Sequence, residues 1–308
     1  MSKNPAEPTR HTGHPRRPDD VDIQGVHWPG YVTEEALNAI KRFDVRDDDV
    51  WITTWPKSGT HWVAEICHLI LNDGHLDKVD RAQVPMPLEF DVEPSENRLA
   101  RYKAAPTWKS PRVLVTHVPV KFLPDQILTG KKGKVITVIR NPKDVLVSLH
   151  HFLNTMEPTS TFEEQLQKNV YSEKAYITSW FEHVPEYWTQ RHKKGHLVLK
   201  YEDMKTDTRG TVIQVADHLE RPLTDEVIDS ITDLVSVQSM KARFNVMGEI
   251  QPPRGEGTTS TGTVGAQHLM RKGIVGDWKN TFTVAQSEAF DTFYRQKMAG
   301  LGLKLEFE

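Results

Sequence analysis

The sequence has little cysteine, no long apolar run and no excess of charge of one sign. The single cysteine, Cys67, excludes an internal disulfide, and its place in the apolar stretch 64–71 favours a buried, unreactive thiol. No stretch approaches the about eighteen consecutive apolar residues of a membrane-spanning helix. The 39 basic and 42 acidic residues give a net charge of −3, which argues against attraction of the whole surface to nucleic acid or an anionic membrane. Any anion-binding site should therefore be local.

The first twenty residues are polar and rich in proline, without the apolar core of a signal peptide or anchor. We predict a flexible tail over residues 1–24 and a cytoplasmic location. With 37% hydrophobic and 26% charged residues, the remainder has the composition of an ordinary globular protein. Residues 25–308 are expected to form a single domain.

Short apolar segments alternate with helical patterns along the chain. The apolar segments predict strands at residues 50–54, 113–117, 134–140 and 196–201. Helical periodicity is found at residues 32–43, 60–72, 180–194, 208–219 and 225–233, and a further helix is expected to start with Asn141 as its cap and Pro142 at its first position. This alternation predicts an α/β fold with a central parallel sheet and helices on both faces. Residues 251–267, rich in Gly, Pro, Thr and Ser, should form an irregular loop, either a lid or a disordered segment.

The segment WPKSGTHW joins the first strand to its helix. A glycine-containing turn at a helix N-terminus favours a phosphate-like anion, and Lys57 adds a full positive charge. A Walker A loop places its lysine after the second glycine, whereas here Lys57 precedes Gly59, so an ordinary nucleotide-triphosphate loop is not matched. The alternative is a structural turn that happens to contain a lysine.

Two more basic turns follow. Arg140 ends a predicted strand, and Ser148 lies two helical turns after Asn141 on the same face. Arg271, Lys272 and Gly273 come directly after the long loop, which could close over a ligand as a lid. Arg140 could instead pair with Asp144, and the Arg271–Lys272 pair could simply be solvated. Three basic turns in a chain of negative net charge nevertheless favour a ligand with two anionic groups.

These motifs resemble those of the cytosolic sulfotransferases, and they occur in the same order. The resemblance covers residues 31–300 and rests on WPKSGTHW, the strand ending in Thr116-His117, RNPKDVLVS, YEDM and RKGIVGDWKNTFT. It implies a P-loop-like sulfotransferase fold that binds 3′-phosphoadenosine 5′-phosphosulfate (PAPS), with no metal required.

The resemblance also implies residue roles. His117 would be the general base for the acceptor hydroxyl, Lys57 would lie on the bridging oxygen of the donor, and Ser148 would contact Lys57 and restrain hydrolysis. The donor-binding residues would be Lys57, Ser58, Gly59, Thr60 and His61 at the phosphosulfate, Arg140, Ser148, Arg271, Lys272 and Gly273 at the 3′-phosphate, and Trp62, Tyr201, Val235 and Met240 around the adenine. A neutral imidazole suits the base, because histidine titrates near pH ~6.5.

The run from Lys279 to Glu288 resembles the family's dimer contact. It would form a homodimer through Lys279, Thr283, Val284 and Glu288. The alternative is a loop that leads into the final helix.

Three positions depart from the family pattern. Val115 stands where many members have a lysine, His61 replaces a threonine, and Val237 replaces an aromatic residue. Loss of the lysine removes a cation near the transferring group, and Lys121 is a candidate substitute.

Two rival functions remain: an ATP-dependent kinase, which the misplaced lysine opposes, and a nucleotide-binding protein without catalysis. The acceptor is expected between the loops 85–91, 150–159 and 251–267. It would be a small phenol, alcohol, sterol or amine.

Overall fold

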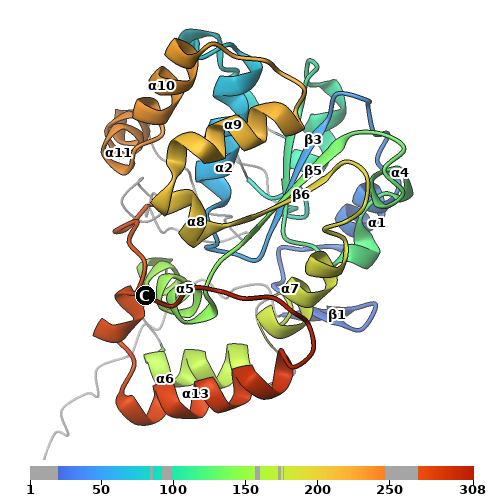
Figure 1. Cartoon of the computed structure of the whole chain (residues 1–308). Helices are drawn as coiled ribbons and strands as arrows, with labels where there is room; N and C mark the ends of the chain where they lie inside the picture. The colour runs from blue at the N-terminus through green and yellow to red at the C-terminus, as the bar shows by residue number, and fades with distance from the viewer. Residues whose placement is uncertain are drawn as a thin grey trace, which may run out of the picture.

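The computed structural model describes residues 20–83, 86–91, 99–156, 160–172, 175, 177–246 and 270–308 (Figure 1). Residues 1–19 of the expected tail and the whole of the expected loop 251–267 lie outside these ranges.

A four-stranded parallel sheet forms the centre of the molecule. Its strands are β3 (Val50–Thr54), β4 (Val113–Thr116), β5 (Lys134–Ile139) and β6 (His196–Lys200), in the order β4-β3-β5-β6. Each begins where the sequence predicted a strand, and each bond ladder is parallel. The predicted α/β fold with a parallel central sheet is confirmed.

Helices cover both faces of this sheet (Figure 1). The helices are α1 (Glu34–Lys41), α2 (Thr60–Leu71), α3 (Arg101–Ala104), α4 (Asp125–Leu128), α5 (Pro142–Met156), α6 (Phe162–Leu166), α7 (Trp180–Thr189), α8 (Tyr201–Thr206), α9 (Thr208–His218), α10 (Asp225–Leu234), α11 (Val237–Val246) and α13 (Val284–Lys297). Asn141 accepts a hydrogen bond from the Lys143 amide at the start of α5, as expected of a cap. Among the described residues, no helix is long and apolar enough to cross a membrane.

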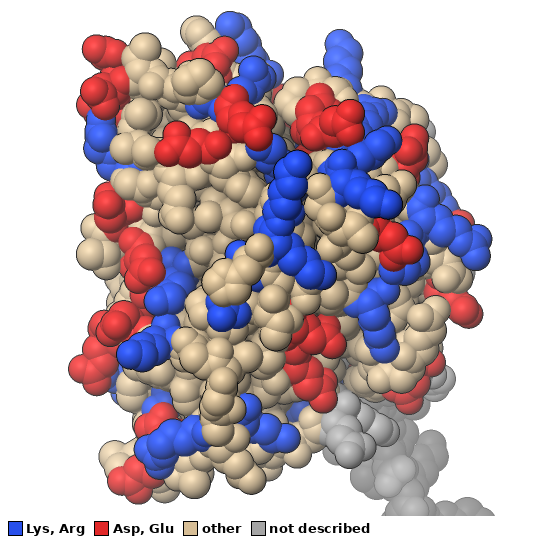
Figure 2. Space-filling view, turned by 45° about the vertical axis from the view of Figure 1, so that its right-hand side comes forward, with Lys and Arg blue, Asp and Glu red and all other residues tan. Residues whose placement is uncertain are grey.

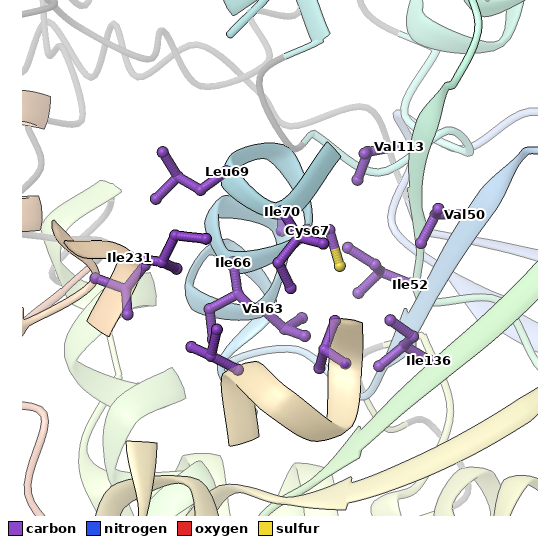
Figure 3. Packing of buried hydrophobic residues seen from close by; sticks show 14 of the residues in the cluster. Val50, Ile52, Val63, Ile66, Cys67, Leu69, Ile70, Val113, Ile136 and Ile231 are labelled. Carbon is purple, nitrogen blue, oxygen red and sulfur yellow. The ribbon is translucent and has the colours of Figure 1, made fainter. Parts of the chain in front are cut away.

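Alternation along the strands divides the core between the two faces. Val50 and Ile52 point to the cluster beneath α2, α9 and α10, whereas Trp51 points to the cluster beneath α1. Cys67 is fully buried in the first cluster, among Val113, Ile136 and other aliphatic side chains (Figure 3). The prediction of a buried cysteine is confirmed, and burial raises the pKa of its thiol, which disfavours the reactive thiolate.

The sequence did not predict the antiparallel hairpin of β1 (Val21–Ile23) and β2 (Val26–Trp28). Its first strand falls in the last residues of the segment for which a tail was expected. Trp28 is fully buried and packs edge-on against Phe122, with ring centroids 5.5 Å apart. Ile23 and Val26 pack against the same cluster, although both strands are too short to leave a clear pattern in the sequence.

Candidate active site

The loop between β3 and α2 places several backbone amides at the carboxyl end of the sheet. Gly59 is the N-cap of α2 and has a φ of 107°, a left-handed conformation that favours glycine. A Cβ atom at this position would lie 2.9 Å from Cδ2 of Tyr201. The close approach of Tyr201 therefore leaves no room for a side chain at Gly59, and the N-terminus of a helix such as α2 favours an anion.

Lys57 lies in the same loop, with a φ of 68°. Its ammonium group is 4.2 Å from the ring centroid of Phe152 on α5, and its carbonyl oxygen accepts a hydrogen bond of 3.1 Å from Arg140 Nη1. Burial is the largest cause that lowers the pKa of Lys57 to about 7, and the charges of Arg140 and Arg271 contribute to the same shift. Cations from all three predicted basic turns thus act on one another.

The third turn is held against the second by Asp144. The Asp144 carboxylate accepts hydrogen bonds from the amides of Gly276 and Trp278, at 2.8 and 2.9 Å. Arg140 Nη2 is 3.9 Å from the same carboxylate, so the alternative pairing of Arg140 with Asp144 is also present, as a long ion pair.

Arg271 and Lys272 both bond to Asp277, a carboxylate of the same turn. Burial raises the pKa of the Asp277 carboxyl, but the bonds from Lys272, Asn280 and Arg271 outweigh it and hold that pKa at about 2. The basic pair is therefore bonded to a carboxylate, although the Lys272 side chain is also 49% exposed to solvent. One ionised Asp277 leaves this turn with a net positive charge.

Ser148 lies on the face of α5 that meets these turns. Phe152, one turn further along, is beneath the Lys57 ammonium, and His151 has its pKa lowered by burial and by Arg271 and Lys272. Ser148 is partly exposed on this shared face.

An aromatic wall borders the same region. Trp62 and Tyr201 meet edge-to-face with centroids 5.5 Å apart, and the Arg140 guanidinium lies 4.2 Å from the Tyr201 ring centroid. Val235 and Met240 are each 1% exposed and belong to the same apolar cluster as Tyr201. The predicted adenine-binding residues are thus brought together.

Gly273 has a φ of 67° and lies against the side chain of Val237, where an added Cβ would be 2.6 Å from Cγ2. Val237, one of the three departures from the family pattern, thus forms the contact between α11 and the third turn.

Several buried polar atoms around this wall make no hydrogen bond to any described residue. They are Ser58 Oγ, His61 Nδ1, Trp62 Nε1, Arg140 Nε and Arg271 Nε. Buried polar atoms are seldom left without partners, so a polar ligand suits this location. The donors among them fit an anionic one.

His117 follows the last residue of β4 and is 7% exposed. Its Nδ1 lies 2.7 Å from the Thr54 carbonyl oxygen and 3.1 Å from Thr54 Oγ1, which is itself 2.7 Å from Thr60 Oγ1. Because a carbonyl only accepts, Nδ1 carries the proton and Nε2 has the lone pair. Burial lowers the pKa of His117 to about 4, opposed by the Thr54 bond and assisted by the charge of Lys57. The imidazole is therefore neutral at physiological pH.

The other two departures from the family pattern are Val115 and His61. Val115 is 2% exposed and packs into the apolar cluster beneath α2. Lys121 donates to the carbonyl oxygen of Gln24 in the β1–β2 turn, which gives no support to its role as a substitute cation. Burial and the charge of Lys57 lower the pKa of His61 to about 3, so a neutral imidazole replaces the usual threonine.

Sequence reasoning missed four residues that organise the site. Three are Thr54, Phe152 and Asp144 in its role as a clamp, and the fourth is Glu89, whose carboxylate accepts hydrogen bonds from the His117 amide and the Thr116 hydroxyl. Each contacts a partner far away in the sequence, and such contacts cannot be predicted from spacing along the chain. The one contact that spacing could indicate is the pairing of Asp144 with Arg140, one helical turn away.

Comparison with known proteins identifies the family. The model of the sulfotransferase domain matches residues 47–302. The chain belongs to the sulfotransferase family. It is 37% identical to sulfotransferase 1A1 of Bos taurus over 301 residues, which are 95% of this chain and 97% of the relative. It is also 37% identical to sulfotransferase 1B1 of Mus musculus, over 92% of this chain and 94% of the relative.

Solved structures agree with this sulfotransferase assignment. A mouse sulfotransferase, SULT7A1 complexed with PAP, is 26% identical and has a TM-score of 0.70, covering 91% of this chain and 94% of its own. A retinol dehydratase in complex with androsterone and PAP has a TM-score of 0.71 at 21% identity, covers 89% of this chain and 88% of its own, and supports the fold alone. The predicted sulfotransferase fold and enzyme class are confirmed.

Proposed function

We propose that this sulfotransferase transfers the sulfuryl group of PAPS to the hydroxyl of a small acceptor, with His117 as general base. The observation that carries the proposal is the meeting of three basic turns beside a neutral histidine whose Nδ1 is held by Thr54. PAP, adenosine 3′,5′-bisphosphate, is the product that PAPS leaves behind, and the mouse relative is complexed with it.

The donor has two anionic ends, and the site offers two groups of cations and amides. The 5′-phosphosulfate would lie at the N-terminus of α2, on Lys57, Ser58, Gly59, Thr60 and His61. The 3′-phosphate would lie between α5 and the third turn, on Arg140, Ser148, Arg271, Lys272 and Gly273. The adenine would lie along Trp62, Tyr201, Val235 and Met240. Ser58 Oγ and Arg140 Nε, which lack partners among the described residues, would gain them from the donor.

Two residues, His117 and Lys57, would carry out the transfer step. His117 Nε2 takes the proton of the acceptor hydroxyl as its oxygen bonds to sulfur, and the bond from sulfur to the bridging phosphate oxygen breaks. The electron pair of that bond stays on PAP, so negative charge grows on the bridging oxygen. The protonated Lys57 ammonium there stabilises the transition state more than the ground state. In this proposal no step needs a metal, and Ser148 holds Lys57 until an acceptor arrives.

Aromatic side chains near His117 suit an apolar acceptor. The Phe90 ring lies 6.5 Å from the His117 ring, and Tyr31 packs edge-on against Phe90 at 4.8 Å. A retinol dehydratase of the same fold forms complexes with retinol and androsterone, which are flat apolar alcohols. Small phenols, alcohols and sterols are the acceptors to test first, with amines as the extension.

The test is transfer of ³⁵S from labelled PAPS to a panel of these compounds, with His117→Ala and Lys57→Ala beside the native protein. Both variants should lose at least about 10²-fold in kcat, since each removes a group that acts in the transition state. Tight binding of PAP without transfer to any acceptor would favour the non-catalytic alternative, and magnesium-dependent consumption of ATP would favour the kinase.

We also propose a homodimer built on the N-terminal end of α13, through Lys279, Thr283, Val284 and Glu288. Val284 is 75% exposed, more than any other large apolar side chain that the structure describes. Glu288 lines a shallow groove with Tyr171 and Phe293. Thr283 caps α13, and Lys279 lies 2.9 Å from Glu308 in an exposed ion pair. The cytoplasmic location stays a prediction.

A further inference from the structure

One buried carboxylate, Glu89, lies directly behind the segment that contains His117. Its side chain is fully buried, and its two oxygens accept bonds from consecutive residues. Oε1 accepts from the His117 amide at 2.8 Å, and Oε2 accepts from the Thr116 hydroxyl at 2.9 Å. The Val118 amide donates in turn to Thr116 Oγ1, at 3.2 Å. The turn that follows β4 is therefore tied to a single side chain.

This arrangement fixes the backbone of His117, whereas Thr54 fixes its ring. The segment 86–91 runs beside β4, because the Leu88 amide donates to the Val115 carbonyl at 2.8 Å. Tyr187 of α7 holds the far side of the turn with a bond from its hydroxyl to the Val118 carbonyl, also at 2.8 Å. The imidazole can move only if one of these ties is broken.

Glu89 is also next to Phe90, whose ring faces His117 and packs on Tyr31. One residue thus connects the apolar wall proposed for the acceptor with the backbone of the proposed base. Placement of the acceptor oxygen against Nε2 depends on both.

We propose that Glu89 is a positioning residue for sulfuryl transfer. Its ionised carboxylate holds the backbone of His117 in place relative to the rings of Phe90 and Tyr31. The inference rests on the proposed function, with His117 as base. Ionisation matters because two donors point at the two oxygens, and a carboxyl group that carries a proton on one oxygen can satisfy only one of them well. Misplacement of a base by about 1 Å can cost on the order of 10²-fold in rate.

The surroundings of Glu89 make its charge sensitive to pH. Burial raises its pKa to about 7, opposed by the bonds from His117 and Thr116. The ionisable groups around it are His117 from the end of β4 and, from α7, Tyr187 and His183, of which His183 lies beside His117. As the pH falls below about 7, Glu89 takes up a proton and one of the two ties weakens.

The test compares Glu89→Gln with Glu89→Ala in the full chain, using PAPS and 4-nitrophenol. Gln keeps the shape and one good acceptor, so kcat should fall about 10-fold, and Ala, which removes both acceptors, should lower it about 100-fold. The KM for PAPS and the Kd for PAP should stay within about twofold of the native values, because Glu89 contacts none of the proposed donor-binding residues. The decline of kcat below about pH 7 should be present in the native protein and absent in Glu89→Gln.

Asp49→Asn is the matched control. Asp49 is equally buried and pairs with Arg112 at the opposite end of the sheet, with 2.6 Å between Oδ2 and Nη2. Its loss should lower the melting temperature and leave kcat unchanged in the folded protein. A Glu89→Gln enzyme with native kcat and native pH profile overturns the proposal, as does an equal loss of kcat in Asp49→Asn.

A second readout does not depend on turnover. The proton chemical shift of the His117 amide, which donates to Glu89, should titrate near pH 7 in the native protein and lose that titration in Glu89→Gln. If no acceptor is turned over but this titration is present, the proposed function fails and the tie between Glu89 and His117 stands. A pH-independent amide shift in the native protein overturns the inference by itself.

Discussion

Lys57 has a strained backbone conformation and an ammonium group close to other cations. A lysine with a φ of 68° occupies the left-handed region at a cost of about 1–2 kcal/mol, and its ammonium group is buried beside two arginines. Strain of this kind persists only where the surroundings fix the residue, and it is concentrated at functional sites. The charges of Arg140 and Arg271 also disfavour the protonated Lys57 ammonium in the free protein, and a bound anion would offset them.

Binding of PAP at pH 8 should drive uptake of close to one proton by Lys57. Its pKa of about 7 in the free protein leaves it mostly neutral at that pH, and the phosphates offset the charges of Arg140 and Arg271, so the pKa rises. Calorimetry in two buffers of different ionisation enthalpy measures the uptake. Lys57→Ala should abolish it, and Lys131→Ala, at an exposed position before β5, should not. Equal binding enthalpies in both buffers would contradict this assignment.

Gly59 provides a test of the loop with a matched control. Gly59→Ala introduces both left-handed strain and a contact of 2.9 Å with the Tyr201 ring, so PAP affinity should fall at least about tenfold. Gly300→Ala introduces similar strain, at a φ of 77°, with no atom within 4 Å of the new Cβ. It should lower stability by about 1 kcal/mol and leave PAP affinity unchanged. The prediction fails if calorimetry gives both variants the same affinity.

At the scale of elements, the strands and the helices that follow them could be predicted because each has a local cause. Short apolar runs bounded by turn residues marked β3 to β6, and the Asn141 cap marked α5. The β1–β2 hairpin could not be predicted in this way, because three-residue strands carry no periodicity and their contacts, such as Trp28 on Phe122 and Lys121 on the Gln24 carbonyl, are with distant parts of the chain.

In the site too, features with a local cause could be predicted and those that depend on distant contacts could not. The basic turns and His117 are visible as motifs, so the cations could be named from the sequence. What holds them could not: Asp144 bonds to amides more than 130 residues away, and Glu89 bonds to a turn 28 residues away. Such hydrogen bonds depend on tertiary packing. Several other acidic residues have similar sequence surroundings, so the sequence could not single out these two.

The N-terminal end of α13 carries a prediction of its own. If Val284 packs on its counterpart across a two-fold axis, Val284→Glu should convert a dimer into a monomer, because it buries an unpaired charge against an apolar contact. Val21→Glu changes a second exposed valine, on the β1 strand, and should leave the assembly intact. Sedimentation velocity separates the two states, and a native protein that stays monomeric at every concentration would remove the basis for the dimer.

At the scale of the whole molecule, one face of the surface and the end of the sheet differ in how charge is arranged. Figure 2 shows Lys and Arg interspersed with Asp and Glu over one face, as expected for a chain with a net charge of −3. At the end of the sheet, by contrast, cations from three separate turns lie close together, near the carboxyl groups of Asp144, Asp277 and Glu202. Attraction of an anion should therefore depend on this one location.

Buried histidines should make the whole fold sensitive to acid. Burial lowers the pKa values of five histidines to between about 3 and about 4: His61, His68, His117, His183 and His218. The unfolded chain therefore binds these protons near pH ~6.5 while the folded chain does not, so stability is present above that pH and is lost as the pH falls towards 4. Glu89 and Glu202, with pKa values raised to about 7, act in the opposite direction and take up protons in the folded state first.

Five histidines against two carboxyl groups leave the unfolded chain with about three more protons between pH ~6.5 and ~4.5. Each proton changes the free energy of unfolding by about 1.4 kcal/mol per pH unit, so the fold should lose about 4 kcal/mol per unit across this window. Urea unfolding at intervals of half a pH unit measures the slope. His68→Gln, away from the proposed donor and acceptor, should reduce it by about one proton, whereas His192→Gln, at an exposed position after α7, should leave it unchanged. A native protein equally stable at pH 5 and pH 7 would mean that these imidazoles take up protons within the folded chain.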